Sequence, residues 1–568
     1  MIATAQETCV EKQGLVEKPT QHHVWEKLAA GVEVSRGAKT PAALEVLTEP
    51  AVALVATLHR RLDAERRELL ADREHRQAAI DGGELPRYPD LCSEAVIGNW
   101  RVAPIPPDLK RRRVEITGPV NHAKMVINML SRNAAGDRAD TAMLDFEDSM
   151  KPTWQNVIDG VHNVKQAAEG TLTYVKRGAD GEPESIYALD PEDSAVMMVR
   201  VRGLHLEESN LRVDGQPVCG GLMDLALTLL HAGQPLIARG RTPKFYVPKC
   251  EHHLEARWWN QLFRLAQTEL GMAVGTLRAT FLIETLPAAF QMEEILYEIR
   301  EHAAGLNVGR WDKIFSDIKV LRRHPDRVLA DRGWISMERP WMRAYAERLV
   351  QVCHRRGAFA IGGMAAFTPG KSAQRRDEQT AKVLADKQLE ASLGHDGCWV
   401  SHPYFIGAAL SAFERDNQLD VIDPEANRYP DLLPQPTGPR TLAGLRTNLR
   451  VGIGYLEGWS RGIGCVAWDD LMEDLATLEI SRAQVWQWLA HGVRLDDGTA
   501  VTEALVRGLF AEELEQILGE IREAMAGASA ETVERTERSF VAAKEEAERV
   551  FLRDELSPFL AKASDLVV

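Results

Sequence analysis

The sequence predicts an α/β protein built around a TIM (β/α)8 barrel, with a helical segment before the barrel and an all-α domain after it. Three observations lead to this prediction. Short apolar runs recur between residues 114 and 403, helix-capable segments separate most of them, and the strand signal stops after about residue 405. Strands that alternate with helices, and that are apolar along their whole length, are typical of a parallel sheet covered on both faces.

The apolar runs are each short enough for one buried strand. They are VEITGP (114–119), AMLDFED (142–148), VMMVRVRG (196–203), KFYVP (244–248), TFLIET (280–285), LNVGRWD (306–312), AFAIGGM (358–364) and GCWVSHP (397–403). This is the number of strands that a TIM barrel requires, so we predict a catalytic barrel over residues 101–405. The stretch from Thr171 to Asp193, rich in Gly, Asp, Glu and Pro, is predicted to be an insertion at its surface.

The chain before the barrel, residues 1–100, is predicted to be a helical clasp with a weakly patterned lead-in over residues 1–45. From Ala51 to Ile80 leucines recur at four-residue spacing, and the pair Gly82 and Gly83 is typical of a helix end. A helix of this length could pack along the outside of the main domain.

The chain after the barrel, residues 406–568, is predicted to be an all-α plug domain. Four segments have helical apolar spacing. They are RTLAGLRTNLRVGIGYLEGWSRG, LMEDLATLEISRAQVWQWLAHGV, TEALVRGLFAEELEQILGEIREAMAG and ETVERTERSFVAAKEEAERVFLRDEL.

Composition excludes several classes of protein. A net charge of −15 argues against a nucleic-acid partner. The 7 cysteines are scattered and contain no CxxC pair, which favours neither a disulfide framework nor a zinc site and suggests a reducing, cytoplasmic location. The N-terminus lacks the pattern of a secretory signal, and no apolar run approaches the roughly 18 residues that span a membrane. The oligomeric state is not indicated.

Charged residues gather where the predicted strands end. The second run ends in Asp145, Glu147 and Asp148, the third contains Arg200 and Arg202, and the fifth and sixth end in Glu284 and Asp312. The carboxyl ends of the strands form the active face of a TIM barrel, and crowded carboxylates favour a divalent cation such as Mg²⁺. The alternative is that the arginines only neutralise these acids in structural ion pairs.

Glu284 and Asp312 are the strongest pair in this set. The segment between them, AAFQMEEILYEIREHAAG, has apolar side chains at Ile295, Leu296 and Ile299, and we interpret it as a helix that stops at Gly305. A strand, helix, strand unit of this kind brings both carboxylates to the same face, so they can share one site.

The sequence resembles the malate synthase family, in its A-type branch, over most of its length. The resemblance lies in motifs that occur in the family's order: RRVEITGP, MLDFEDSMKPTW, VRVRGLHL, PKCEHHLEARWWN, RATFLIET, GLNVGRWDKIFSDIK, IGGMAA, HDGCWVSHP and GIGCVAWDDLMEDLATLEISRAQVWQW. It implies condensation of acetyl-CoA with glyoxylate, followed by thioester hydrolysis to malate and CoA, with Mg²⁺ as cofactor, as in the glyoxylate bypass. The family's architecture of clasp, barrel and helical plug is similar to the one predicted above.

The resemblance also implies roles for individual residues. Glu284 and Asp312 would bind the metal, and Gly309, Arg310 and Trp311 would surround glyoxylate. Arg200 matches the family's catalytic arginine and Asp474 its catalytic base. Glu147 and Asp148 would reach the metal through water, and Ser149 would contact the CoA arm.

An aspartate base and an arginine suit the condensation that the resemblance implies. A carboxylate base can deprotonate a thioester methyl group only when a fixed positive donor, here Arg200, stabilises the enolate oxygen. Two other functions compete with this one. A magnesium-dependent lyase or aldolase would cleave malyl-CoA or a similar ester without hydrolysing it, and an acyl-CoA-binding protein would lack turnover altogether. The helical domain argues against the lyase, because its LMED motif supplies a base that a simple lyase would not need there. The presence of Arg200, Glu284, Asp312 and Asp474 together argues against a protein that only binds acyl-CoA.

Overall fold

Eight parallel strands close into a barrel at the centre of the protein. The computed structural model describes residues 24–178 and 181–560. The strands are β3 (Val114–Pro119), β4 (Thr141–Asp145), β7 (Val196–Arg200), β10 (Lys244–Val247), β11 (Arg278–Ile283), β12 (Ala303–Val308), β13 (Phe359–Ala365) and β14 (Gly397–Val400). They pair in the order β10-β11-β12-β13-β14-β3-β4-β7, and β7 pairs with β10 to close the barrel. Each corresponds to one predicted apolar run, so the predicted TIM barrel is confirmed.

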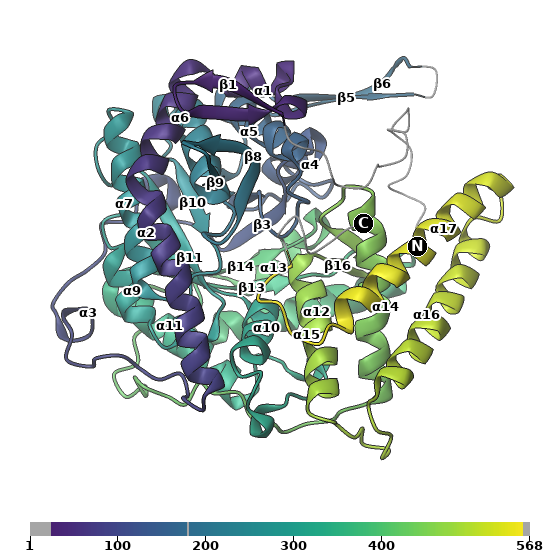
Figure 1. The fold of residues 1–568 in the computed structure, drawn as a ribbon. Helices are drawn as coiled ribbons and strands as arrows, with labels where there is room; N and C mark the ends of the chain where they lie inside the picture. The colour runs from purple at the N-terminus through teal and green to yellow at the C-terminus, as the bar shows by residue number, and fades with distance from the viewer. Residues whose placement is uncertain (1–23, 179–180, 561–568) are drawn as a thin grey trace.

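Helices cover the outside of the barrel (Figure 1). They are α4 (Ala123–Leu130), α5 (Trp154–Glu169), α6 (Gly220–Ala238), α7 (His253–Glu269), α8 (Leu286–Ala289), α9 (Met292–Glu298), α10 (Arg310–Val320), α11 (Pro340–Arg356), α12 (Ala373–Ser392) and α13 (Ile406–Ala412). Short 3-10 turns lie at η1 (Arg36–Ala38), η2 (Pro107–Leu109), η3 (Pro325–Arg327), η4 (Arg332–Trp334) and η5 (Pro403–Phe405).

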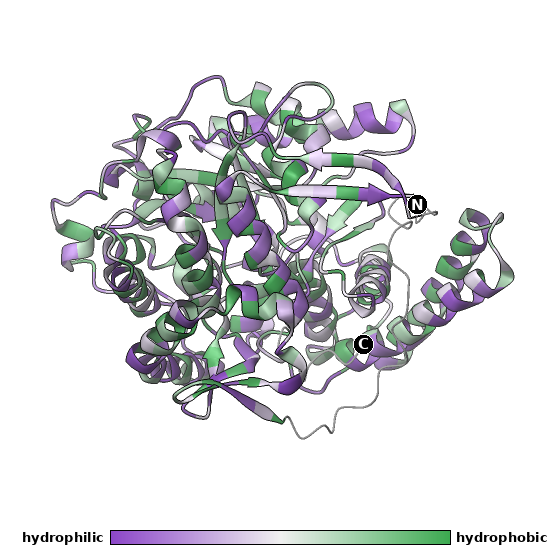
Figure 2. Ribbon diagram, turned by 90° about the horizontal axis from the view of Figure 1, so that it is seen from above, coloured by the Kyte–Doolittle hydropathy of each residue, from purple (hydrophilic) through white to green (hydrophobic). Residues whose placement is uncertain are grey.

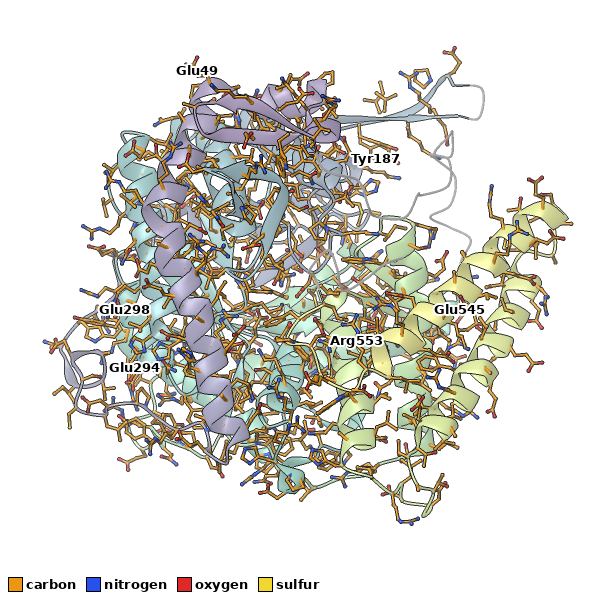
Figure 3. The ribbon with its side chains drawn as sticks, viewed as in Figure 1. Glu49, Tyr187, Glu294, Glu298, Glu545 and Arg553 are labelled. Atoms are coloured by element: carbon orange, nitrogen blue, oxygen red, sulfur yellow. The ribbon has the colours of Figure 1, made fainter. Side chains whose placement is uncertain are left out.

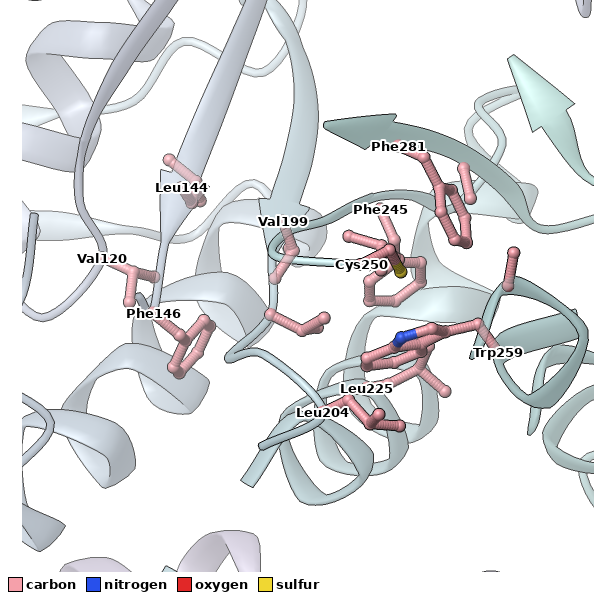
Figure 4. Packing of buried hydrophobic residues seen from close by; sticks show 14 of the residues in the cluster. Val120, Leu144, Phe146, Val199, Leu204, Leu225, Phe245, Cys250, Trp259 and Phe281 are labelled. Carbon is pink, nitrogen blue, oxygen red and sulfur yellow. The ribbon is translucent and has the colours of Figure 1, made fainter. Parts of the chain in front are cut away.

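Side chains of the strands alternate between the two faces of the barrel wall. Val199, Phe245 and Phe281 belong to the large cluster that packs under helices such as α6 and α7, where Leu225 and Trp259 lie (Figure 4). Their neighbours Met198, Tyr246 and Leu282 belong to a separate cluster inside the barrel. This alternation explains why the strands are apolar throughout: both faces are buried.

One prediction about the segment between β11 and β12 is wrong. Gly305 does not stop a helix but lies within β12, and the expected single helix is divided into α8 and α9. A Cβ atom at Gly305 would lie 2.4 Å from the carbonyl oxygen of Phe359 on the neighbouring strand β13. The glycine therefore permits close approach of two strands, a tertiary requirement that resembles a helix-stop signal in the sequence.

The N-terminal region contains the predicted long helix, α2 (Glu49–Asp81), preceded by α1 (Pro41–Val46) and followed by α3 (Glu94–Ile97). It also contains two strands where a weakly patterned lead-in was expected. β1 (Trp25–Ala29) and β2 (Val32–Ser35) form an antiparallel sheet with β8 (Glu207–Val213) and β9 (Gln216–Cys219). The prediction of a weakly patterned lead-in is wrong for these residues. The sequence signal is weak because β8, the partner strand of β2, lies far along the chain. The first 23 residues of the predicted lead-in lie outside the described part of the chain.

The predicted insertion between β4 and β7 is a β-hairpin. Its strands β5 (Thr173–Arg177) and β6 (Pro183–Ala188) pair with each other alone and project from the body of the molecule (Figure 1).

The C-terminal region is mainly helical, as predicted, with α14 (Leu442–Ser460), α15 (Leu475–Ala490), α16 (Glu503–Ala524) and α17 (Ala530–Phe551). These helices enclose an apolar cluster of their own, and α16 and α17 extend away from the barrel in both views (Figures 1 and 2). The prediction of an all-α region is wrong where β15 (Val466–Trp468) and β16 (Leu471–Glu473) form a small hairpin, so that LME of the LMED motif is strand. Residues 414–441, before α14, contain no helix either. Of the helices within residues 24–178 and 181–560, none has the length and apolarity needed to cross a membrane.

Candidate active site

A cavity of about 90 Å³ lies at the carboxyl ends of the barrel strands. Its wall includes residues from β3, from the ends of β4, β7, β11 and β12, and from β13 and β14. The C-terminal region completes the wall with Cys465, Met472, Asp474, Ala476 and Thr477. The cavity therefore lies between the barrel and the helical region and requires both.

Glu284 and Asp312, the predicted metal ligands, both line this cavity. Glu284 directly follows β11 and is fully buried, and Asp312 lies in the first turn of α10, just after β12. Burial, and then the negative charge of Asp312, raise the pKa of Glu284 to about 8. The strand, helix, strand unit thus brings the two carboxylates to one face, as the sequence predicted.

Lys249 lies at the centre of the carboxylate cluster, and sequence reasoning missed it. Its Nζ is 2.7 Å from Asp148 Oδ2, 3.0 Å from Asp312 Oδ1, 3.1 Å from Glu147 Oε1 and 3.7 Å from Glu284 Oε1. Although burial opposes its charge, these carboxylates raise the pKa of Lys249 well above its usual value. A signal existed: Lys249 comes directly after the apolar run KFYVP, at the end of a predicted strand.

Arg200 stands at the end of β7 and also lines the cavity. Its guanidinium donates to both oxygens of Asp145, at 2.7 and 2.6 Å, and lies 3.3 Å from Glu147. Burial opposes ionisation of Asp145, but the Arg200 charge outweighs it and lowers the pKa of that carboxyl. This bidentate salt bridge between Arg200 and Asp145 fixes the orientation of the guanidinium at the cavity wall.

Three polar residues of the stretch FEDS (146–149) lie at two cavities. Ser149 lines the cavity, and its hydroxyl donates to Asp145 Oδ2 at 2.5 Å. Glu147 and Asp148 are buried beside Lys249, on the wall of a second, much smaller cavity. Burial, followed by mutual repulsion in this crowded group, raises the pKa of Glu147.

Gly309, Arg310 and Trp311 line the cavity between the two predicted metal ligands. A Cβ atom at Gly309 would lie 2.9 Å from Cβ of Glu284, so any larger residue at this position would displace the Glu284 side chain. The Trp311 ring packs against two arginines: the guanidinium carbons of Arg310 and Arg332 are 4.3 and 5.4 Å from its centroid. Of these two, Arg310 lines the cavity and brings a positive charge to this part of the wall.

Asp474 enters the same cavity from the other side. It is the N-cap of α15, where its Oδ1 accepts from the Thr477 backbone N–H at 3.3 Å. The cap fixes the carboxylate at the point where the helical region meets the barrel. Burial, and then the charges of Asp148 and Asp312, raise the pKa of Asp474 to about 7. Such a carboxyl group can take up or release a proton near neutral pH.

Arg202, the second arginine of the VRVR motif, does not join this site. It donates to Asp224 at 2.8 Å and to Glu208 at 2.9 Å, and all three side chains are buried. For Arg202 the structural ion pair, one of the two alternatives left open by the sequence, is the correct one.

The cluster differs from ordinary surface charge in its burial. Acidic side chains such as Glu49 and Glu545 stand in solvent (Figure 3), whereas Glu284, Glu147 and Asp148 are all less than 9% exposed. In the interior, repulsion between like charges is poorly screened, so such a group needs cations to remain ionised.

The cavity wall has the donors that suit Mg²⁺. Glu284 Oε2 is buried without a hydrogen-bond partner, and Asp312 Oδ1 is buried with the Lys249 ammonium at 3.0 Å as its charged neighbour. Both oxygens belong to hard carboxylate ligands. No group of three or more His, Cys, Asp or Glu side chains is arranged to hold a metal by itself in the described ranges. Magnesium requires fewer protein ligands, because it commonly takes one or two carboxylates and fills its other positions with water and substrate. The residues present fit this ion.

Comparisons of the sequence with known families and curated proteins point to one family. Family models match for the malate synthase N-terminal domain at residues 30–89, the malate synthase TIM barrel domain at residues 196–428 and the malate synthase C-terminal domain at residues 439–563. The chain is 48% identical over 491 residues to malate synthase of Myxococcus xanthus, covering 85% of this chain and 88% of that protein. It is 45% identical over 486 residues to malate synthase A of Escherichia coli, covering 84% and 89%.

Solved structures give a weaker match. The magnesium and glyoxylate complex of Haloferax volcanii malate synthase is similar with a TM-score of 0.40 and 15% identity, covering 75% of this chain and 98% of that one. A likeness at this level assigns no residue of the site.

Proposed function

The chain belongs to the malate synthase family, and we propose that Arg200, Asp474, Glu284 and Asp312 perform the family's reaction in it. The reaction condenses acetyl-CoA with glyoxylate and hydrolyses the thioester to give malate and CoA. The observation that best supports this assignment is that Asp474 from the helical region lines the same cavity as the three barrel residues.

Asp474 is the proposed general base, which removes a proton from the acetyl methyl group. Its pKa of about 7 is suited to this role, since a base is most effective when its pKa lies near the working pH. The methyl group is a very weak acid, so the enolate oxygen that develops must be stabilised. Arg200 is the proposed donor, because its guanidinium is held rigidly by Asp145 and faces the cavity.

Glu284 and Asp312 are the proposed ligands of Mg²⁺. Bound there, the ion would supply Lewis-acid polarisation of the glyoxylate aldehyde. Gly309, Arg310 and Trp311 would surround glyoxylate, and the positive charge of Arg310 at the cavity wall would favour its carboxylate. Glu147 and Asp148 would hold the outer layer of the site, and Ser149 would contact the CoA arm.

The proposed function also gives each of the three predicted domains a role. We propose a clasp over residues 1–100, a catalytic barrel over 101–405 and a plug over 406–568. The plug must lie against the barrel for Asp474 to meet Arg200, so their contact would assemble the site. A cytoplasmic location is part of the proposal, supported by six free cysteines among the described residues.

The test is release of the CoA thiol from acetyl-CoA, measured with and without glyoxylate and with Mg²⁺ or a chelator, with identification of the acid product. We expect thiol only when glyoxylate and metal are both present, together with malate. Cleavage of malyl-CoA to acetyl-CoA and glyoxylate without thiol release would instead identify a lyase. The absence of turnover in both directions would favour an acyl-CoA-binding protein.

A further inference from the structure

Arg73 extends from the N-terminal helix α2 into the wall of the barrel. The helix runs down the outside of the molecule from Glu49 (Figures 1 and 3). Most of its contacts are apolar, but the Arg73 side chain is only 9% exposed and donates through Nε and Nη2 to the two oxygens of Glu255, at 2.8 and 2.7 Å. Its Nη2 also donates to the backbone carbonyl of Lys249, at 2.8 Å.

Lys249 is the residue through which this contact reaches the site. It lies in the connection between β10 and α7, and both its backbone and its side chain touch the carboxylate cluster. The backbone N–H donates to Glu284 Oε1 at 2.8 Å, while Nζ lies 2.7 Å from Asp148 and 3.0 Å from Asp312. A rotation of this one peptide would therefore move contacts to three carboxylates at once.

The backbone of Lys249 is in a conformation that needs outside support. Its φ is +56°, in the left-handed region that residues with a Cβ atom seldom adopt because of steric strain. Strain of this kind persists only where neighbouring groups hold the backbone in place.

Arg73 supplies that support from two directions. It binds the Lys249 carbonyl directly, and it holds Glu255, whose Oε2 accepts the Glu251 backbone N–H at 2.8 Å two residues further along the same connection. Glu255 is completely buried, so this arrangement excludes water that could replace either bond.

We propose that Arg73 is a positioning residue of the active site: by fastening the connection at Lys249, the clasp helix fixes the lysine and Glu284 for metal binding and turnover. This inference rests on the proposed function, and it gives the N-terminal clasp a part in the reaction beyond bracing the barrel.

Arg60 provides a matched control on the same helix. It too binds one carboxylate and one backbone carbonyl, donating to Asp214 at 2.8 Å and to Ala30 O at 3.0 Å. These partners belong to the small antiparallel sheet around β1, β2, β8 and β9 and not to the cavity wall. The Arg60 side chain is 44% exposed and that of Arg73 only 9%, so loss of Arg60 should lower the unfolding midpoint less. Of the two arginines, only Arg73 touches the connection at Lys249.

The experiment compares Arg73→Lys, Arg73→Gln and Arg60→Gln in the full chain. Three quantities are measured: the dissociation constant of Mg²⁺ by calorimetry without substrates, kcat and KM for acetyl-CoA, and the midpoint of thermal unfolding. Arg73→Lys keeps the charge beside Glu255 but cannot bind Glu255 in a fork and the Lys249 carbonyl together. It is the deciding variant if Arg73→Gln does not fold.

For the Arg73 variants we expect Mg²⁺ binding to weaken by about tenfold to hundredfold and kcat to fall by a similar factor, as for other groups that orient metal ligands or reacting groups. KM for acetyl-CoA should change little, because Arg73 does not touch the part of the wall around Ser149. Arg60→Gln should keep the wild-type Mg²⁺ affinity and kcat, whatever it does to the unfolding midpoint.

Two results would overturn the role of Arg73. One is wild-type Mg²⁺ affinity and kcat in a folded Arg73→Lys protein. The other is an equal loss in Arg60→Gln, which would make the clasp a general brace. A wild-type protein that forms no malate would refute the proposed function instead, so the two failures are distinguishable.

Discussion

Two of the buried groups of charges in the barrel differ in the balance between acids and bases. Deep inside it, Arg112 faces one carboxylate, Glu115, at 2.6 Å, and also donates to Thr280 at 3.0 Å and Tyr246 at 2.7 Å. The other oxygen of Glu115 accepts from Trp399 at 3.0 Å and from the Tyr246 hydroxyl. In this lower group each charge has one opposite charge, and neither Arg112 nor Glu115 lines the cavity.

At the carboxyl end of the same strands the carboxylates outnumber the cations. Arg200 and Lys249 face a larger set of acids, namely Asp145, Glu147, Asp148, Glu284, Asp312 and Asp474. The buried oxygen Glu284 Oε2 lacks a hydrogen-bond partner.

Burial of charge alone therefore does not identify a functional site. A balanced, fully hydrogen-bonded pair such as Arg112 and Glu115 maintains the shape of the barrel. An excess of buried carboxylates beside a cavity, with the Glu284 Oε2 atom lacking a hydrogen-bond partner, favours binding of a ligand of the opposite sign.

The strongest loss of activity is expected among the charges at the carboxyl ends of the strands, which form the upper group. Asp474→Asn should lower kcat by about a thousandfold, because the amide cannot take a proton from acetyl-CoA. Asparagine is also a good N-cap, so the start of α15 and the unfolding midpoint should be preserved. Thiol release and thermal unfolding measure the two quantities. Wild-type turnover in this variant would remove Asp474 from the mechanism.

The lower group should show the opposite pattern. Arg112→Met leaves Glu115 buried without its counter-charge, which should destabilise the protein by about 3–5 kcal/mol. The folded fraction should keep kcat within a few-fold, as thermal unfolding and activity per folded molecule will test. Replacing both partners, in Arg112→Met with Glu115→Met, should restore part of the stability. A stable Arg112→Met protein with a large loss of kcat would contradict the division into two groups.

Arg200→Lys tests whether geometry matters in the upper group beyond charge. Lysine keeps the positive charge but not the fork that Asp145 orients, so kcat should fall by about a hundredfold. KM for glyoxylate and the unfolding midpoint should change less. If the lysine variant retained wild-type kcat, charge alone would account for the role of Arg200.

The smallest expected effect is a shift along the pH axis. Because burial and then Asp148 and Asp312 raise the pKa of Asp474 to about 7, kcat/KM should fall below about that pH, where the base is protonated. A bound cation favours the ionised form and should move this limb to lower pH. Asp148→Asn removes one repelling charge and should also move it to lower pH. An unchanged limb in Asp148→Asn would show that crowding does not set the pKa of Asp474.

Some features could be predicted from local sequence because local sequence causes them. Each barrel strand is an apolar run, and a run buried on both faces needs no knowledge of its neighbours to be recognised. Glu284 and Arg200 could be proposed from their positions at strand ends, and parallel strands bring those ends to one face. The α2 helix was predicted from its leucine spacing and its glycine end.

Other features depended on residues far apart in the chain. β2 pairs with β8, with Val32 opposite Val213, and neither strand has a strong pattern alone. From the sequence, Gly305 is interpreted as a helix end. Its role in the close approach of β12 and β13 depends on Phe359 of the neighbouring strand. The LMED motif suggested a continuous helix, whereas its aspartate caps α15 after a short strand.

The barrel, its helical additions and the residue types at the strand ends can be recognised from the sequence alone, since they follow from hydrophobic period and chain order. The central position of Lys249 in the carboxylate cluster, its contact with Arg73 and the separate ion pair of Arg202 become visible only in the folded protein. Interactions between charges depend on distance in space and on exclusion of water, and the order of residues specifies neither directly.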